Sequence, residues 1–457
     1  MNPTRLALVI MAAGLFFQAG HATAQTVNLQ QAVEMSLAAD PRIKEREQVV
    51  ESARGLLAEV KANTGWRANA NAFIGLAPEV KGGFYQGGAT NCSAFPCTPR
   101  SDGDSLHGLS DWTHLEFALI KPLYTFGKVD QYSAAAQGNV DIKHGDVSLT
   151  KADIALDTKR AYYGYLTARD IRLFLEDVQG RLNDAISRTE EALKRENGEV
   201  TQAELYSLQA TRGVVAKYVY QAQAVERISL DGLKVLTGVG LKAPLAVADE
   251  RLSPVDFPKA ELADLQAKAL ADRPEMQQLE AGLRARRALV AAKKADILPD
   301  VYAGVVGTLN YASQRDRLDN PHIYDPFNNG GLTPIVGIKW DAAFGVAKAR
   351  TAQAEADLDA LNYKKQFALT GIPYEVAEAY TNARANFESQ KELAEASSAA
   401  RRWVIAAIAD FNAGLEKGDK VAEAFKSYVL AQTDYLRTLN DYDVNVAQLA
   451  KLTGELK

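Results

Sequence analysis

The chain has few of the residues that build catalytic and metal sites. Its 457 residues include five histidines and two cysteines, and no histidine has the spacing of a metal-ligand pair. No glycine-rich phosphate loop and no nucleophile elbow occurs. The formal net charge of −5 is spread along the chain, whereas a nucleic-acid-binding surface needs a clustered basic face. We therefore expect no catalytic residue, no cofactor, no metal site and no nucleic-acid partner.

Long apolar runs are also missing after the first residues. The run from Leu6 to Gly20 follows Arg5 and precedes the small residues Ala22-Thr23-Ala24, which is the pattern of a cleavable signal peptide over residues 1–24. An uncleaved anchor helix is the alternative, but the run is shorter than the roughly 20 residues that span a membrane. No later stretch could cross a bilayer as a helix, so a membrane role would need strands.

The two cysteines, Cys92 and Cys97, lie close together in the sequence. An exported chain enters an oxidising compartment, which favours a disulfide bond between them. A pair of metal-binding thiols is the alternative, with His107 and His114 as the nearest further ligands. We predict the disulfide, because a metal would need more soft ligands nearby.

The chain contains two similar halves. LQQAVEMSLAADPRI, residues 29–43, aligns without a gap with LADLQAKALADRPEM, residues 262–276. A long helical stretch in each half ends in the same tripeptide, Leu236-Thr237-Gly238 and Leu452-Thr453-Gly454. We predict two structural repeats, 25–257 and 258–457, each with a helix, two strands and a long helical hairpin. A linker closes the first repeat.

Proline is absent from 123–243 and after Pro373, and both regions are rich in good helix formers. Glycine is the usual residue at which a helix ends and the chain reverses, so Gly198 and Gly414 predict a turn between two long helices in each half. Ala-rich seams predict coiled-coil packing. We expect Pro373 to kink its helix or to end a turn there. An ordinary cytosolic coiled coil is the alternative, but the signal peptide argues against it.

Four shorter segments alternate apolar and polar residues: 67–76, 113–121, 301–311 and 335–340. Such alternation is typical of a membrane strand with lipid on one side and water on the other, although a half-buried soluble sheet would look the same. Aromatic residues lie near the strand ends, as at a membrane interface: Trp66, Trp112, Tyr124, Tyr311 and Trp340. Four strands cannot close a barrel, and an open sheet edge is costly in hydrocarbon. Three chains would give about twelve strands.

The order and duplication of these motifs resemble the TolC-like family of outer-membrane efflux and secretion channels. Lys121-Pro122-Leu123-Tyr124-Thr125-Phe126-Gly127 resembles the family's junction between barrel and long helix, and 197–201 and 411–415 resemble its helix turns. In the second half, Ala342-Ala343-Phe344-Gly345 is a poor version of that junction.

The resemblance implies a mixed α and β fold, in which a membrane β-barrel shared by a homotrimer continues into a long α-helical coiled-coil barrel in the periplasm. It implies an exit duct for efflux or type I secretion, docked through a periplasmic adaptor on an inner-membrane pump or ABC transporter. A periplasmic coiled-coil scaffold or adhesion protein without transport is the alternative.

Acidic residues cluster near the second helix turn: Asp410, Glu416, Asp419 and Glu423. Threefold symmetry would repeat each as a ring, and an acidic ring at a constriction favours cations. Asp419 and Glu423 are the candidate pore-mouth ring, and Glu423 is the better match to the family's acidic gate position. Ordinary solvated charges at a helix end are the alternative. The extra Gly418 and the added charge in 415–424 depart from the usual tip.

Overall fold

The computed structural model describes residues 25–80, 85, 96–99, 108–194, 200–316 and 324–456. The predicted signal peptide, 1–24, lies outside these ranges. Among the described residues, no helix has both the length and the apolar character to cross a membrane.

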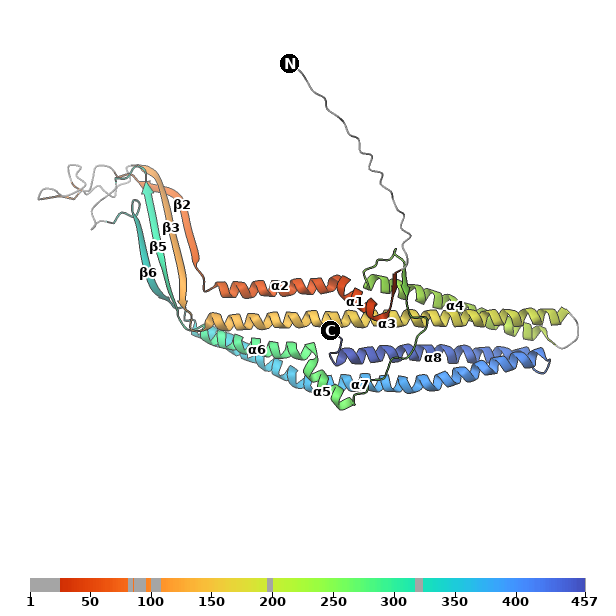
Figure 1. The fold of residues 1–457 in the computed structure, drawn as a ribbon. Helices are drawn as coiled ribbons and strands as arrows, with labels where there is room; N and C mark the ends of the chain where they lie inside the picture. Colours follow the sequence, from red (N-terminus) through yellow and green to blue (C-terminus); the bar gives the residue numbers. More distant parts are fainter. Residues whose placement is uncertain are drawn as a thin grey trace, which may run out of the picture. The chain divides into compact units, whose positions relative to one another are not determined.

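The elements follow one another in two similar series (Figure 1). The first series comprises β1 (Gln25–Val27), α1 (Leu29–Ala39), α2 (Pro41–Ala62), β2 (Arg67–Pro78), β3 (Leu109–Tyr124), α3 (Lys128–Lys194) and α4 (Gln202–Leu236). The second comprises β4 (Leu245–Val247), α5 (Leu262–Asp272), α6 (Pro274–Ala295), β5 (Asp300–Ala312), β6 (Gly330–Lys339), α7 (Phe344–Asn412) and α8 (Gly418–Leu452). All four predicted strand segments are present as β2, β3, β5 and β6.

Corresponding helices have nearly equal lengths. Helices α1 and α5 have 11 residues each, α2 and α6 have 22, and α4 and α8 have 35. The long helices α3 and α7 have 67 and 69 residues. These matching lengths are the structural reason to propose two repeats.

The last helix of each series ends in the same way. Gly238 and Gly454 follow α4 and α8 with positive φ angles of 72° and 74°, which glycine adopts at little cost. The hydroxyls of Thr237 and Thr453 each donate to a carbonyl one turn earlier. The repeated Leu-Thr-Gly tripeptide is therefore a helix stop, with threonine satisfying a terminal carbonyl and glycine reversing the chain.

The chain forms two compact units. The helical unit contains the residues up to Ile43, Thr150–Ala269 and Tyr374–Lys457, and the sheet unit contains Lys44–Leu149 and Leu270–Pro373. Strands β1 and β4 pair in parallel within the helical unit. The sheet unit holds an antiparallel four-stranded sheet of order β2-β3-β5-β6.

Four helices build the core of the helical unit. Leu182 of α3, Leu208 of α4, Val404 of α7 and Phe425 of α8 belong to one buried cluster. A second cluster gathers Tyr162, Leu233 and Tyr442 with the linker residue Leu252. In the sheet unit, the residues of α2 that pack on the start of α3 are Val50, Ala53 and Leu57. These apolar seams follow from the three- and four-residue spacing of the sequence.

Of the two expected effects of Pro373, a kink in the helix or the end of a turn, the second does not occur and the first stays a prediction. Helix α7 continues through Pro373 from Phe344 to Asn412. Proline removes one backbone donor and crowds the preceding turn, but Ile372 and Val376 on either side are buried. Burial of these side chains offsets the loss of one hydrogen bond in so long a helix.

Candidate functional site

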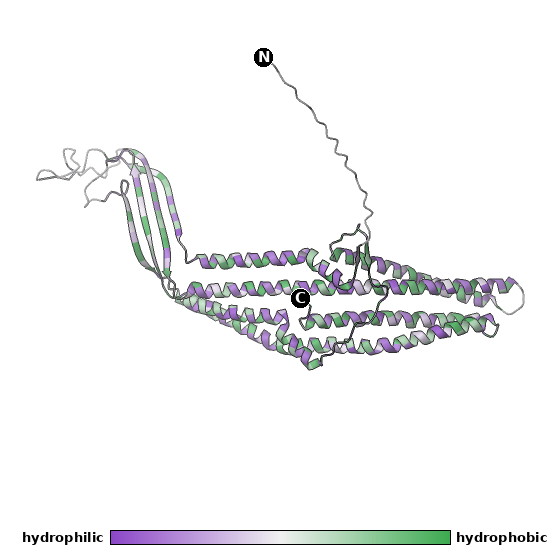
Figure 2. Cartoon of the chain, viewed as in Figure 1, coloured by the Kyte–Doolittle hydropathy of each residue, from purple (hydrophilic) through white to green (hydrophobic). Residues whose placement is uncertain are grey.

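One face of the sheet is apolar across all four strands. The strand register aligns Ala70, Phe117, Gly307 and Leu332 in one row. The flanking rows on this face contain further apolar residues: Ala68, Leu119, Val305 and Pro334 on one side, and Ala72, Leu115, Leu309 and Gly330 on the other. Figure 2 shows the alternation of hydrophobic and hydrophilic residues along the strands.

This apolar face is exposed on the chain. Ile74, Leu332, Val336 and Ile338 keep 80 %, 67 %, 76 % and 67 % of their surface exposed. A soluble half-buried sheet would cover such residues, because each buried side chain of this size contributes about 1.5–3 kcal/mol. A contiguous exposed apolar face marks a membrane or protein contact. The strand pattern of the sequence therefore describes a surface that meets an apolar medium.

The opposite face is polar and carries a residue that the sequence reading did not select. Glu116 aligns with Asn71 on β2 and with Thr308 on β5. It is exposed and forms no ion pair with any described residue. One row away, His114 Nδ1 lies 2.5 Å from Asn310 Oδ1. The strand alternation placed Glu116 on this face, but nothing in the sequence distinguished it from other surface acids.

Exposed aromatic rings lie at the ends of the strands. Trp66, Tyr124, Trp340 and Tyr311 are 61 %, 58 %, 62 % and 57 % exposed. The fifth predicted ring, Trp112, lies near the start of β3 and packs edge-on against Phe73 and Phe327. Four of the five predicted aromatics thus remain available to an interface.

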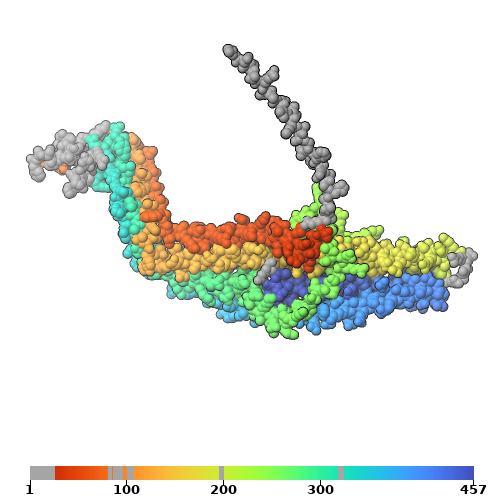
Figure 3. Space-filling model, viewed as in Figure 1, coloured from red at the N-terminus to blue at the C-terminus, as the bar shows by residue number. Residues whose placement is uncertain are grey.

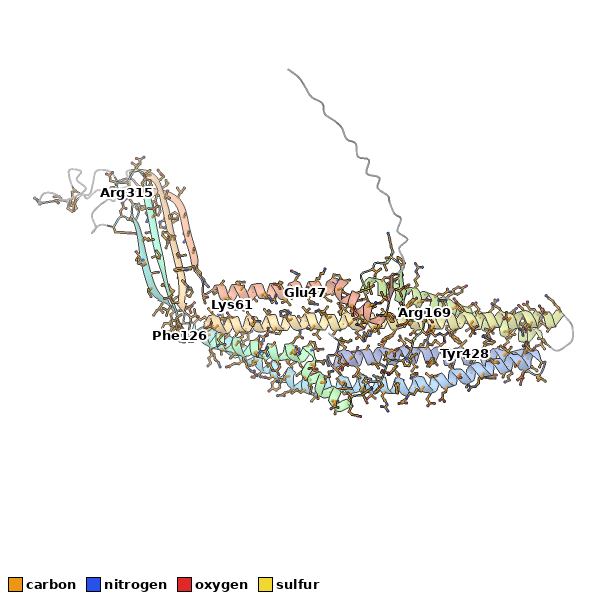
Figure 4. The ribbon with its side chains drawn as sticks, viewed as in Figure 1. Glu47, Lys61, Phe126, Arg169, Arg315 and Tyr428 are labelled. Atoms are coloured by element: carbon orange, nitrogen blue, oxygen red, sulfur yellow. The ribbon has the colours of Figure 1, made fainter. Side chains whose placement is uncertain are left out.

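A buried ion pair stabilises the end of the sheet at which the loops lie. The sequence did not predict it. Arg315 Nε lies 2.9 and 2.7 Å from the two carboxylate oxygens of Asp325, and its NH1 donates to the Pro78 carbonyl at 3.0 Å. The Arg315 guanidinium also lies over the Phe327 ring at 5.0 Å. Figure 4 labels Arg315 at this end of the strands. The pair joins two residues of the segment between β5 and β6, and the hydrogen bond of Arg315 to Pro78 ties this segment to the end of β2.

The junction between β3 and α3 contains two consecutive residues in the left-handed region of backbone conformation. Phe126 and Gly127 have positive φ angles of 52° and 76°, so the chain reverses between strand and helix over two residues. In the second half, Phe344 and Gly345 already belong to α7. The poorer motif at 342–345 therefore corresponds to a different turn.

The second helix turn is closed by Gly414. Its φ is 68°, its amide donates to the Phe411 carbonyl at 3.1 Å, and the Leu415 amide donates to the Asp410 carbonyl at 2.9 Å. These two bonds form a Schellman motif, which satisfies the last carbonyls of α7. The corresponding Gly198 lies outside the described residues, so its turn stays a prediction.

The predicted acidic residues lie in the first turns of α8. Glu423 Oε2 pairs with Lys420 Nζ at 3.0 Å, and both side chains are more than half exposed. Asp419 Oδ1 accepts from the Lys420 amide at 2.9 Å. The pKa of Lys420 is raised, first by its hydrogen bond to Glu423. Asp419 and Glu423 are therefore solvated in the single chain, and their role in a ring stays a prediction.

Gly418 has a packing role beside these charges. A Cβ at Gly418 would lie 3.2 Å from the Cβ of Glu204 and 3.5 Å from the Phe411 ring. Glu204 is itself buried and closes a capping box with Thr201 at the start of α4. The glycine that departs from the usual tip lets α8 approach the first turn of α4.

Buried polar groups bind the linker between α4 and α5 to the long helices. Tyr442 donates to the Val255 carbonyl at 2.8 Å, and Asp443 Oδ1 accepts from the Val255 amide at 3.0 Å. The Leu252 amide donates to Asp170 Oδ2 at 2.9 Å. Figure 3 shows the linker, in green, crossing α8, in dark blue. Arg169, labelled in Figure 4, donates to the Asp249 carbonyl at 2.7 Å.

Asp443 is the most deeply buried acid of this linker contact. The residue is 0 % exposed, and its Oδ2 has no hydrogen-bond partner among the described residues. Burial raises the pKa of Asp443 to about 7, opposed by the Val255 amide. Its sequence context, Asp441-Tyr442-Asp443, is typical of an exposed helix surface, so no local pattern marks Asp443 as buried.

Cys97 is disulfide-bonded. Its predicted partner Cys92 lies outside the described residues, so the pairing itself stays a prediction. No group of three or more His, Cys, Asp or Glu side chains that could hold a metal ion occurs in the part of the chain that the structure describes.

Comparison with known proteins shows what the chain is similar to. Residues 265–455 match the family of outer membrane efflux proteins. No curated protein matches the chain. Among solved structures, the outer-membrane channel CmeC of Campylobacter jejuni is 14 % identical with a TM-score of 0.74, over 100 % of this chain and 94 % of that one.

Two further channels have the same fold. CusC is 16 % identical with a TM-score of 0.74, over 99 % of both chains. The outer membrane protein VceC of Vibrio cholerae is 16 % identical with a TM-score of 0.71, over 93 % of this chain and 96 % of that one.

The predicted resemblance to TolC-like outer-membrane channels is confirmed, as are an efflux channel function and an outer-membrane location with a periplasmic extension. The family and these relatives are channel proteins, not enzymes.

Proposed function

We propose that three copies of this chain close one membrane β-barrel and continue it as a helical tunnel, forming an exit duct for efflux or type I secretion. The observation that carries the proposal is the exposed apolar face of a sheet with two unpaired edges. Among the described residues, β2 pairs with β3 alone and β6 with β5 alone. An unpaired edge in hydrocarbon costs several kcal/mol for each polar group, so neighbouring chains must supply the missing strands.

The exposed surface of helix α4 is a second reason to expect that copies of this chain associate, here outside the membrane. Exposed apolar residues recur along it at multiples of seven residues: Val214, Ile228 and Val235 in one row, in which Gln221 takes the remaining position, and Tyr218 and Val225 in a second. A seven-residue period of exposed apolar side chains is typical of a coiled-coil seam that still lacks its partner. A second copy of the chain would supply that partner. A monomeric periplasmic scaffold would leave both this seam and the sheet face in water.

We also propose that the chain has protein partners in the periplasm and that it consists of two repeats. A periplasmic adaptor with an inner-membrane pump or ABC transporter would meet the helix turns around Gly198 and Gly414, where each hairpin reverses. The two repeats, 25–257 and 258–457, would place two such hairpins in each chain. The matching helix lengths and the shared helix stops support this organisation.

Two measurements test the proposal. The mature protein should leave outer membranes only with detergent, and it should give stepwise conductance in planar bilayers. Glu116 should lie in the lumen, so Glu116→Gln should weaken the preference for cations. Glu47→Gln, on the exposed surface of α2, serves as the control of equal charge. A protein that is freely soluble without detergent and gives no conductance would instead support the scaffold.

A further inference from the structure

Lys121 ends the apolar face of β3 without an acidic partner. It aligns with Ala303 of β5 in the same alternation as Leu119 and Val305, which places it on the apolar side. Its ammonium lies 6.0 Å from the centre of the Trp66 ring. Among the described residues it forms no ion pair, in contrast to Lys128 nearby, which pairs with Asp300 at 3.0 Å. A charge at the border of an apolar surface therefore remains uncompensated.

A β-bulge adds a third side chain to the same spot. The register between β3 and β5 shifts between Pro122 and Tyr124, so that Tyr124 aligns with Val301. Val301 lies two residues from Ala303, on the same face, and without the shift Tyr124 would face the other side. Tyr124 and Trp66 are 58 % and 61 % exposed. Trp66 thus lies beside the Lys121 ammonium, and Tyr124, whose ring packs on Phe126 at 4.6 Å, follows on the same face two β5 residues further on, at Val301.

We propose that Trp66, Lys121 and Tyr124 bind the phosphate of a phospholipid headgroup in the leaflet that faces the periplasm. Tryptophan and tyrosine rings concentrate at the headgroup level of a membrane, and a lysine there reaches toward the headgroups while its stem lies along apolar surface. Headgroup phosphate supplies the negative charge that Lys121 lacks. The site continues the apolar face, so one lipid can contact both. This inference rests on the proposed membrane position of the sheet.

An anionic lipid should bind more tightly than a zwitterionic one, because it adds net negative charge near Lys121. One lysine near an anionic surface contributes enough attraction for an about fivefold difference in affinity. The test uses the full-length mature assembly in neutral detergent, titrated with phosphatidylglycerol and, separately, with phosphatidylcholine, with bound lipid counted by native mass spectrometry. Lys121→Gln should lose about fivefold in affinity for phosphatidylglycerol and little for phosphatidylcholine, and Lys121→Arg should restore it.

Lys217→Gln is the matched control. Lys217 lies 5.2 Å from the Tyr218 ring on α4, so it is also a lysine beside an aromatic ring, but on a helix without strands. Inorganic phosphate at equal concentration should not displace the lipid. Equal phosphatidylglycerol binding by wild type and Lys121→Gln would overturn the headgroup site while leaving the barrel intact. A wild-type protein that binds neither lipid and needs no detergent would overturn the barrel proposal as well.

Discussion

At the residue scale, the groups with the largest departures from ordinary behaviour lie where the linker meets the long helices. Asp443 has a pKa raised to about 7 by burial, against an ordinary value near 4. Between about pH 4 and pH 7 the carboxyl group of Asp443 therefore keeps its proton in the folded protein and loses it in the unfolded chain. Stability that depends on Asp443 is complete below about pH 4, falls as pH rises toward 7 and is constant above that.

Asp443→Asn should remove this decline, because asparagine is uncharged at every pH. Relative to wild type, the free energy of unfolding of the variant should rise by about 2 kcal/mol between pH 5 and pH 8. Urea unfolding followed by circular dichroism at the two pH values measures this difference. Asp441→Asn, at an exposed position two residues away, should show no such difference. A parallel pH dependence of wild type and Asp443→Asn would contradict the burial account.

The acidic residues of the second turn carry the second residue-scale prediction. If Asp419 and Glu423 line a closed mouth, Asp419→Ala with Glu423→Ala should raise resting conductance and weaken cation preference in single-channel recordings. The Lys420–Glu423 pair is exposed and screened by water, so Glu423→Ala alone should act partially. Glu388→Ala, which breaks a similar pair with Lys391 at 3.2 Å on α7, is the control. Unchanged recordings in the double variant would mean that these charges are merely solvated.

At the element scale, turns and helix stops decide how the long helices end. Gly414 has a φ of 68°, and a Cβ there would meet no atom within 4 Å. Gly414→Ala therefore adds only backbone strain and should lower the free energy of unfolding by about 1 kcal/mol. Gly213→Ala in the middle of α4, also in open space, should raise it by about 0.5–1 kcal/mol. Urea titration of both variants tests this contrast. Changes in the free energy of unfolding that have the same sign in both variants would refute it.

The loop between Cys92 and Cys97 gives a prediction about thermal stability. A disulfide between Cys92 and Cys97 closes a very short loop, so it constrains the unfolded chain little. Replacing both cysteines with serine should change the midpoint of thermal unfolding only slightly. Thiol titration of untreated mature protein should find no free thiol, and two reactive thiols would contradict the pairing.

Much of the element pattern could be predicted from local sequence. Alternation found β2, β3, β5 and β6, and the absence of proline found α3 and α4. The ends of the strands were predicted less well. Strand β3 runs from Leu109 to Tyr124, beyond the predicted 113–121, through residues that do not strictly alternate. Contacts that depend on tertiary structure could not be predicted: the Arg315–Asp325 pair depends on the path of the loop between β5 and β6, and the burial of Asp443 depends on how the linker packs against α8.

At the scale of the whole molecule, the account depends on completion by other copies of the chain. The sheet has four strands and two unpaired edges, its apolar face is exposed, and α4 carries an unpartnered seven-residue apolar period. Each feature would be costly in an isolated protein, and one threefold assembly in a membrane accounts for all of them. The match of residues 265–455 to the family of outer membrane efflux proteins is consistent with such an assembly.

The mass of the purified assembly decides whether three chains complete the barrel. Mature protein extracted in neutral detergent and measured by native mass spectrometry should carry three chains, and disruption of the trimer should abolish conductance in planar bilayers. A stable monomer that keeps its full strand content by circular dichroism would contradict the account, because four strands with exposed edges should not persist alone.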